Sequence, residues 1–429
     1  MKSFSKQSDY NMKLSIKDMH NVINRNIENF HDVETIYKEH ANKQKIKIEN
    51  TDNITTSVEI LFSSMKETYL KGTDIKDFIP WFIQHLKDSI KYLLNSESTH
   101  FQKDNNYIYI PFSQTGEESE FQFNRNEIFG ILSCCLFGID LMTKNYSNGS
   151  SISFKRIIPD KKGLQKLLCI VSYLFTMCVY PEKEEIVTFS RCILSNTIQW
   201  EESKQLLIDV EFGAHGIETS DYPIQVDFSN RNIHLGTISY SATQEEIIFA
   251  VKPECYLSIV LFDTMAENEC ILIKSPLTIS KTSGFRNSFR WNSLLTEKEM
   301  TKEISILAID SCTSKCFDEE NIKRDLNKCY IGFLSGKGNI ASDQWGCGVF
   351  GNDPALKFFQ QVCVVSELNY HLKLHWMDEK EYIKLHNILK QMIKKKMTIA
   401  DLYHIIVNYK KNSNSFKFGE YLQNEVIKF

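Results

Sequence analysis

The second half of the sequence predicts an α/β fold, and two patterns indicate it. From about residue 206 onward, short apolar segments with the alternation typical of strands take turns with longer segments whose apolar residues recur at helical spacing. Strands that alternate with helices on this scale are typical of a layered α/β domain. The chain has 429 residues, of which 42% are apolar, and this is enough for two domains with buried cores.

The first half of the chain has a different pattern. Residues 1–50 are rich in charged and amide side chains and contain neither Pro nor Gly, so we expect a polar N-terminal extension with little core. Apolar residues then recur at helical spacing, most continuously in Leu164–Val179, which we expect to be a buried helix. The sequence therefore predicts a mostly helical accessory domain over residues 51–205 and the α/β domain over residues 206–429.

The individual elements of the α/β domain can be placed in chain order from the same patterns. The expected strands are Leu206–Phe212, Ile224–Phe228, Cys270–Lys274, Ile304–Ile309 and His371–Trp376. The expected helices are Glu245–Val251, Asn321–Leu334, Pro354–Leu368, Lys380–Lys395 and Ile399–Tyr409. Pro253 ends the first of these helices, since proline cannot continue one.

Composition excludes several classes of ligand. The formal net charge of −4 argues against broad electrostatic binding to a polyanion, so we expect no direct binding of DNA or RNA. The twelve cysteines form no paired CxxC motif with nearby histidines, and Cys312 and Cys316 are the nearest approach to a ligand pair. We therefore expect free thiols, no metal and no cofactor.

The sequence also bounds where the protein acts. The first thirty residues are polar and charged and show no signal peptide. The longest apolar run, Leu167–Tyr180, is too short to span a bilayer. We expect an intracellular protein of the cytoplasm or nucleus, and a secreted effector that acts inside a host cell fits the same features.

One stretch of the α/β domain combines a strand, a polar loop and the start of a helix. The strand Ile224–Phe228 is followed by a loop that contains Gly236, and the paired carboxylates Glu245 and Glu246 open the next helix. Such a connection is a common place for an active site, because rigid elements hold side chains while the loop shapes a pocket. Adjacent glutamates in a first helical turn are, by themselves, more often there for capping and the helix dipole.

The sequence around these glutamates resembles that of the poly(ADP-ribose) glycohydrolase family. Two blocks carry the family's signatures: Val226-Asp227-Phe228-x-Asn230, followed by Gln244-Glu245-Glu246-Ile247-x-Phe249, and the loop Trp345-Gly346-Cys347-Gly348-Val349-Phe350-Gly351-x-Asp353. Shorter matching segments fall between them in the family's order, over about residues 206–410. The resemblance implies a macrodomain-like three-layer α/β/α core with a mixed sheet, preceded by a mostly helical accessory domain. It also implies that ADP-ribose binds at the ends of the strands.

The resemblance implies a reaction as well, namely cleavage of the ribose–ribose O-glycosidic bonds of poly(ADP-ribose) with release of ADP-ribose. Breaking such a bond needs a proton for the departing oxygen, which is the work of carboxyl groups in glycosidases. A carboxyl group donates a proton near neutrality only if burial or a neighbouring negative charge raises its pKa. By resemblance Glu246 is the general acid/base, while Glu245 holds the ribose hydroxyls and helps to keep Glu246 protonated.

Further binding roles follow from the resemblance alone. Asn230 matches the asparagine that binds the terminal ribose, although a turn residue that closes the strand is the simpler interpretation. Ile217 and Glu218 fall at about the position where the family accepts a hydrogen bond from the adenine amino group. Gln244 is expected to lie close to the same nucleotide. Trp376 falls where an aromatic ring stacks on adenosine, with an ordinary core aromatic as the alternative.

The second signature loop is expected to wrap the diphosphate with backbone N–H groups. Its residues are Gly346, Cys347, Gly348, Val349 and Phe350, and the glycines allow the close approach. A helix that begins near Pro354 would add the favourable end of its dipole.

Three positions depart from the family pattern at the catalytic end. The family's three consecutive glycines are replaced by His234-Leu235-Gly236, its substrate-facing tyrosine by Thr282, and a glycine by Asn352. The altered loop leaves two alternatives to polymer cleavage. One is a hydrolase that removes ADP-ribose from modified proteins, and the other is a non-catalytic protein that only binds ADP-ribose.

Overall fold

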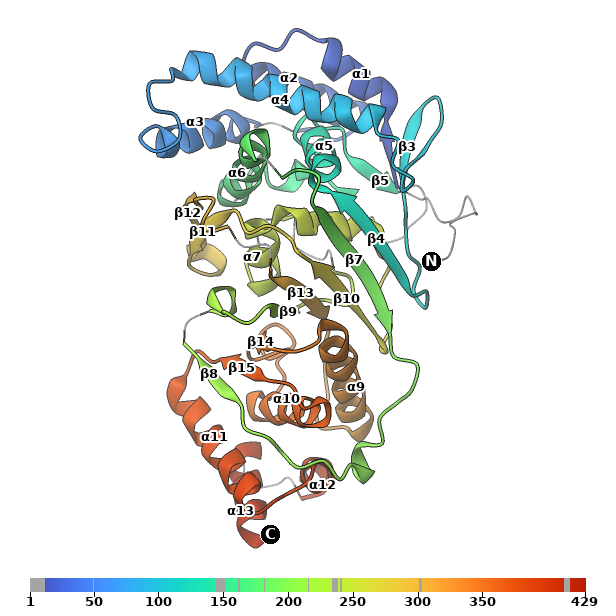
Figure 1. The fold of residues 1–429 in the computed structure, drawn as a ribbon, viewed down its shortest axis with the longest axis vertical. Coiled ribbons are helices and arrows are strands. Elements are labelled where there is room, and N and C mark those ends of the chain that lie inside the picture. The colour runs from blue at the N-terminus through green and yellow to red at the C-terminus, as the bar shows by residue number, and fades with distance from the viewer. Residues whose placement is uncertain are drawn as a thin grey trace.

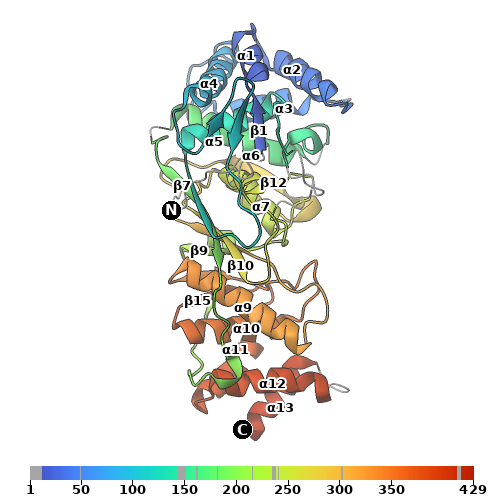
Figure 2. The ribbon, with the colours of Figure 1, turned by 90° about the vertical axis from the view of Figure 1, so that its right-hand side faces the viewer.

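The computed structural model describes residues 12–48, 50–143, 151–160, 163–180, 182–214, 216–233, 238–239, 241–300, 303–412 and 417–429. The molecule is elongated, with the helices of the first half at one end, the last helices of the chain at the other and a large sheet between them (Figure 1). The view turned by 90° shows the same order along the long axis (Figure 2). No helix in the described part of the chain is both long and apolar enough to cross a membrane.

Helices form most of the first half. They are α1 (Ile16–Asn24), α2 (Phe30–Lys43), α3 (Asn53–Met65), α4 (Ile75–Asn95), α5 (Arg125–Leu136) and α6 (Leu164–Val179), with one 3₁₀ turn at Phe154–Arg156. A small antiparallel sheet in the order β2-β3-β1-β5-β6 packs beside them. Its strands are β1 (Met12–Ser15), β2 (Gln102–Lys103), β3 (Tyr107–Ile110), β5 (Leu141–Thr143) and β6 (Ser151–Ile152).

The large sheet runs in the order β4-β7-β10-β13-β9-β14-β15-β8. Its strands are β4 (Ser119–Asn124), β7 (Ile186–Ile193), β8 (Glu211–Gly213), β9 (Ile224–Phe228), β10 (Glu269–Lys274), β13 (Ser305–Ile309), β14 (Ile340–Ser342) and β15 (Leu372–His375). The strands from β13 to β8 pair in parallel, whereas β10 is antiparallel to both β13 and β7. The sheet is therefore mixed, as predicted. Two of its strands, β4 and β7, come from the first half of the chain, so both halves share one sheet.

Helices cover both faces of this sheet. They are α7 (Gln244–Val251) and α8 (Ser258–Leu261) on one side, and α9 (Glu319–Gly336), α10 (Pro354–Leu368), α11 (Glu379–Lys394), α12 (Ile399–Asn412) and α13 (Phe418–Lys428) on the other. The remaining elements are the hairpin β11 (Ser280–Ser283) and β12 (Arg290–Leu294), and 3₁₀ turns at Trp200–Glu202, Ile217–Thr219, Pro253–Leu257 and Arg286–Ser288. The predicted three-layer α/β/α core with a helical accessory part is confirmed.

Alternation along β9 decides which side chains face α7. Ile224 and Val226 belong to the core on the α9 and α10 side of the sheet. Because successive strand residues point to opposite faces, Gln225 and Asp227 face the α7 side. Both are fully buried, so β9 carries polar side chains into an otherwise apolar layer.

The expectation that the N-terminal residues offer little core does not hold for residues 12–43. β1, α1 and α2 contribute many fully buried side chains to the accessory core: Met12, Leu14, Met19, Val22, Phe30, Val33, Ile36 and Tyr37. These apolar residues lie on one face of each element, while most of the charged residues between them are at least partly exposed and Glu34 is buried. The average composition of the segment hides that periodicity.

A buried ion pair joins the first half of the chain to the layer beside α7. Arg125, the first residue of α5, is 1% exposed, and its Nε lies 3.0 Å from Oε1 of Glu254, which is fully buried. Its Nη1 lies 2.8 Å from Glu185 Oε2, and its Nη2 donates to the Ser275 carbonyl at 2.8 Å. Glu254 also accepts from Leu277 N at 2.7 Å. One guanidinium thus ties three segments together.

We expect Arg125→Met to lower the free energy of unfolding by about 3–5 kcal/mol, because it leaves Glu254 as an uncompensated buried carboxylate. Urea unfolding followed by circular dichroism measures the change. The matched control is Arg25→Met, which breaks the exposed pair with Glu39 and should cost less than about 1 kcal/mol. Equal losses in the two variants would contradict the bridging role of Arg125.

Candidate functional site

The end of β9 and the start of α7 are fastened by one side chain. The Gln244 side chain donates from Nε2 to the Val226 carbonyl at 2.8 Å and accepts at Oε1 from Phe228 N, also at 2.8 Å. The side-chain amide thus pairs with one backbone N–H group and one backbone carbonyl at the end of β9, as a residue of a neighbouring strand would. Gln244 therefore fixes the direction in which the following two glutamates leave the sheet.

Glu246 acts as the capping residue of α7. Its Oε2 accepts from Thr243 N at 2.5 Å and from the Thr243 hydroxyl. A glutamate three residues after a threonine cap is the standard capping box, and it satisfies an N–H group that the helix itself cannot. In this conformation the Glu246 carboxylate is 6% exposed and faces Thr243.

Glu245 and Asp227 form a buried carboxyl cluster with Glu246. Burial raises the pKa of Glu245 well above its ordinary value, and the charges of Asp227 and Glu246 raise it further. Burial also raises the pKa of Asp227, with Glu246 adding to the effect. Neither carboxyl oxygen of Asp227 has a hydrogen-bond partner among the described residues, and Oε1 of Glu245 has none either. Burial and mutual repulsion therefore favour the protonated forms of Glu245 and Asp227.

A lysine from the accessory half lies near this cluster. Lys166, in α6, is 1% exposed, and α6 packs directly against α7. Burial lowers the pKa of Lys166 to about 8, and the charges of Glu246, Cys169 and Glu245 oppose that shift. The ammonium group therefore persists at neutral pH and partly compensates the carboxylates. Lys166 was missed from the sequence, where it is one polar residue in an apolar helix.

A pocket of about 240 Å³ opens beside Glu245. Its walls are the end of β9, the start of α7, the tip of the β11–β12 hairpin and the loop after β14: Phe228, Thr243, Gln244, Glu245, Phe285, Arg286, Asp343, Gln344, Gly346–Phe350 and Met377. The structure thus brings the predicted Gln244 and Glu245 together with the predicted loop Gly346 to Phe350.

The shape of that loop depends on Asn352. Its Nδ2 donates to Ser311 Oγ at 2.9 Å, to the Cys312 carbonyl at 2.9 Å and to the Gly346 carbonyl at 3.0 Å, and the residue is 4% exposed. Gly346 has φ +75°, and a Cβ there would lie 2.1 Å from Ser311 Oγ, so only glycine fits. A buried amide therefore holds the two ends of the loop together.

The start of α10 does not offer a free dipole end to the loop. Asp353 is its N-cap, and its carboxylate accepts from Leu356 N at 3.0 Å. The predicted contribution of this helix to diphosphate binding is therefore not supported, because a negative side chain already occupies the site that an anion would take.

Other predicted residues do not line the pocket. Asn230 Oδ1 accepts from Asn232 N at 3.0 Å, as in a turn, and the Asn230 backbone N–H donates to the Glu245 carboxyl group. Ile217 is buried in the core, while Glu218 is exposed and close enough to Asp343 to raise the pKa of that carboxyl. His234, Leu235 and Gly236, including the predicted ligand contact of Gly236, lie outside the described residues.

The predicted stacking of Trp376 on adenosine is not supported by its position. Its indole is 3% exposed, Nε1 donates to Glu381 Oε2 at 3.0 Å, and the ring meets Phe358 edge-on at a centroid distance of 5.8 Å. These are the contacts of a core aromatic. The next residue, Met377, reaches the pocket and is 92% exposed.

Among the lining residues that sequence reasoning had not assigned, Asp343, Phe285 and Arg286 matter most for the chemistry. Asp343 directly follows β14, and burial raises its pKa to about 7. Phe285 and Arg286 stand at the hairpin tip, where Arg286 N donates to the Ala242 carbonyl at 2.7 Å. The signal for the last two was their place in the segment Gly284 to Trp291, which matches the family. Among the described residues that line the pocket, Arg286 carries the positive charge.

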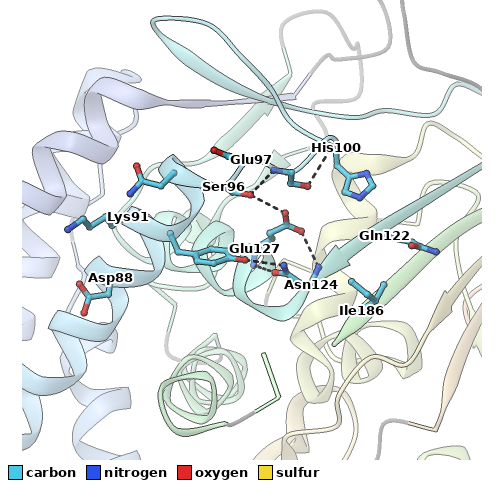
Figure 3. Close-up of a pocket in the computed structure, with 12 residues that line it drawn as sticks. Asp88, Lys91, Ser96, Glu97, His100, Gln122, Asn124, Glu127 and Ile186 are labelled. Atoms are coloured by element: carbon cyan, nitrogen blue, oxygen red, sulfur yellow. Dashed lines mark hydrogen bonds between the residues drawn. The ribbon is translucent and has the colours of Figure 1, made fainter. Parts of the chain in front are cut away.

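A second, wider hollow of about 680 Å³ lies on the accessory half, between the end of α4, β4 and the start of α5 (Figure 3). Its polar groups are bound to one another: Asn124 and Glu127 form the capping box of α5, Ser96 Oγ donates to Glu127 at 3.4 Å, and Asn124 Nδ2 donates to Tyr92 OH at 3.1 Å. It therefore has the character of a surface depression between capped helices.

Among the residues that the structure describes, no group of three or more His, Cys, Asp or Glu side chains has an arrangement that could hold a metal ion.

Comparison with known proteins gives two matching family models. The model of the poly(ADP-ribose) glycohydrolase catalytic domain with the Macro domain fold matches residues 197–384, and the model of the helical domain of the same family matches residues 76–191. The two matches together cover well over half of the chain and include the β9–α7 connection, the pocket loop and Lys166.

Two curated relatives are named as members of the same family. Poly(ADP-ribose) glycohydrolase 1 of Caenorhabditis elegans is 27% identical over 63% of this chain and 38% of its own length, and poly(ADP-ribose) glycohydrolase 2 of the same organism is 29% identical over 48% and 50%. The chain thus spans half or less of these two relatives. A solved poly(ADP-ribose) glycohydrolase of Thermomonospora curvata, bound to the inhibitor ADP-HPD, is 14% identical over 42% of this chain and 72% of its own, with a TM-score of 0.30. On the strength of the two family models, the chain belongs to the poly(ADP-ribose) glycohydrolase family.

Proposed function

We propose that the protein is a glycohydrolase that releases ADP-ribose from poly(ADP-ribose), with Glu246 as general acid/base and Glu245 as its partner. The observation that carries the proposal is the buried carboxyl cluster at the start of α7, beside a pocket that the second signature loop also lines. Protonation of a departing ribosyl oxygen requires a carboxyl group whose surroundings favour its protonated form, as burial does for Glu245.

The pocket suits one ADP-ribose unit by its charge and its shape. The loop Gly346 to Phe350 offers backbone N–H groups to a diphosphate, and Arg286 adds a positive charge at the rim. Asp343 lines the other side of the pocket, where a carboxylate can accept from an adenine amino group. The nucleotide would lie along the pocket with its terminal ribose toward Glu245.

The present conformation gives the two glutamates different starting positions. Glu245 faces the pocket, while Glu246 is bound to Thr243 and has to leave the capping box before it can reach a glycosidic oxygen. Family membership favours Glu246 as the acid, and the raised pKa of Glu245 favours exchange of the two roles. Kinetics of the two variants separates these assignments.

We expect Glu246→Gln to lower the rate of ADP-ribose release from automodified polymer by about 10²–10⁴, the usual contribution of an acid/base group. Glu245→Gln should lower it less and raise KM, because Glu245 would hold the ribose. Release is counted by chromatography, and ADP-ribose binding is measured by calorimetry. An inactive Glu245→Gln with an active Glu246→Gln would exchange the roles.

Mono-ADP-ribosylated protein as a second substrate tests the alternative function, a hydrolase that removes ADP-ribose from modified proteins. Binding of ADP-ribose without release from either substrate would identify a non-catalytic binding protein.

We expect Lys166→Met to move both limbs of the pH–rate profile to higher pH. The Lys166 ammonium favours ionised carboxylates beside it, so its removal should favour the protonated forms. The difference from wild type should shrink above about pH 8, where wild-type Lys166 loses its own proton. The control is Lys252→Met, which removes another lysine that is 1% exposed and has its pKa lowered to about 8, at the other end of α7. An unchanged profile in Lys166→Met would contradict the proposed electrostatic role.

We expect Asn352→Ala to weaken ADP-ribose binding about tenfold, which corresponds to about 1.4 kcal/mol, because the loop loses the amide that joins its ends. Calorimetry measures Kd, and KM should rise with little change in kcat. Asn321→Ala is the control, since that amide binds the carbonyls of Ser314 and Lys315 at 3.2 and 3.1 Å in a loop outside the pocket. Equal affinities of Asn352→Ala and wild type would show that the loop holds its shape without this side chain.

A further inference from the structure

Two cysteines lie directly opposite each other in the large sheet. Cys192 on β7 pairs with Cys270 on β10 in antiparallel register. Two residues along the ladder, Leu194 N donates to the Asn268 carbonyl at 2.8 Å, so the alternation of the ladder also places the cysteines at a hydrogen-bonded position. The Cα atoms of such a pair are about 5.5 Å apart. A disulfide usually spans about 4.4–6.8 Å between Cα atoms, so this register can accommodate one.

The two thiols differ in exposure and in acidity. Cys270 is fully buried, with Sγ 3.6 Å from Ser335 Oγ and 3.8 Å from the Ile331 carbonyl of α9, whereas Cys192 is partly exposed. The hydrogen bond from Cys270 lowers the pKa of Cys192 to about 7, and the same bond together with burial raises the pKa of Cys270. At neutral pH a substantial fraction of Cys192 is therefore thiolate, the form that reacts.

The other cysteines behave in the opposite way. All twelve lie in the described part of the chain, and burial raises the pKa of each of the remaining ten: Cys134, Cys135, Cys169, Cys178, Cys255, Cys312, Cys316, Cys329, Cys347 and Cys363. A buried protonated thiol has to lose its proton before it can attack, so these ten thiols are expected to react slowly with a peroxide. The contrast singles out Cys192 as the reactive thiol, with a second thiol already beside it.

We propose that Cys192 and Cys270 are an oxidation site for hydroperoxides, with Cys192 as the attacking cysteine and Cys270 as the resolving cysteine. The Cys192 thiolate attacks hydrogen peroxide, the O–O bond breaks, and Cys192 sulfenic acid and hydroxide form. The Cys270 sulfur then attacks the Cys192 sulfur and breaks its S–O bond, and the departing hydroxide takes up the thiol proton of Cys270 and leaves as water. In sum, two thiols lose two electrons and two protons to one peroxide, and one disulfide and two waters result.

The disulfide would add a covalent link within the large sheet. It would join β7, which follows the accessory helices, to β10, and the closed segment would contain β9, the β9–α7 connection and α7. It would also turn the Cys270 sulfur away from α9. The proposal does not depend on the proposed glycohydrolase activity, since it concerns thiols outside the pocket walls.

Mass spectrometry of the whole protein tests the proposal without any variant. Reduced protein is treated with a small excess of hydrogen peroxide at pH 7, remaining thiols are blocked with N-ethylmaleimide, and peptides are mapped without reduction. We expect a peptide pair joined through residues 192 and 270, which dithiothreitol separates. Alkylation of Cys192 by iodoacetamide in the untreated protein should follow a titration with a midpoint near pH 7.

Variants assign the order of the two steps. Cys270→Ser should leave Cys192 as a sulfenic acid that dimedone traps, whereas Cys192→Ser should leave Cys270 unmodified. Cys316→Ser removes another partly exposed thiol and should leave the cross-link unchanged. Oxidation spread over Cys316 and Cys347 with no 192–270 cross-link would overturn the proposal, as would equal dimedone labelling in the Cys192→Ser and Cys270→Ser proteins.

Discussion

The burial of carboxyl groups where β9 ends and α7 begins is the constraint on which the rest of the site depends. Asp227 and Glu245 are withdrawn from water, and in such surroundings a carboxylic acid is far more stable than a carboxylate without a cation. Folding therefore favours the protonated forms of these two groups, in line with the raised pKa of each. Under the proposed function, the same burial that costs stability would help a carboxyl group of this cluster to donate a proton.

Such a costly arrangement persists only if the surrounding structure holds it. β9 has parallel neighbours on both sides, β13 and β14, and the Gln244 amide fixes the turn into α7. The accessory half closes the other side, because α6 packs on α7 and brings the Lys166 ammonium near the carboxylates. Arg125 ties that half to the same layer through Glu254. The helical half thus places a positive charge near the carboxyl groups and helps to exclude water from them.

Local signals in the sequence decide which of these features could be predicted. The strand Ile224–Phe228 and the helix Pro354–Leu368 have the predicted bounds, because alternation, helical spacing and a proline at the first helical position act within the segment. Residues 12–43 were misjudged, since composition hides an amphipathic helix. Lys166 could not be found, because its carboxyl neighbours are far away in the chain. The core position of Trp376 likewise depends on contacts that only the fold creates.

Asn352 shows how a departure from the family pattern can still serve the pocket. Glycine gives a loop freedom, whereas the Asn352 amide removes it by binding Ser311, Cys312 and Gly346. Behind the loop, buried Asp325 accepts from Cys312 N at 3.0 Å and pairs with Lys357, whose ammonium lies 4.2 Å from the centre of the Trp345 ring. A loop held from both sides has little conformational entropy left to lose when a ligand arrives. If the loop binds a diphosphate as proposed, Asn352 would add rigidity to the conformation that Gly346 permits.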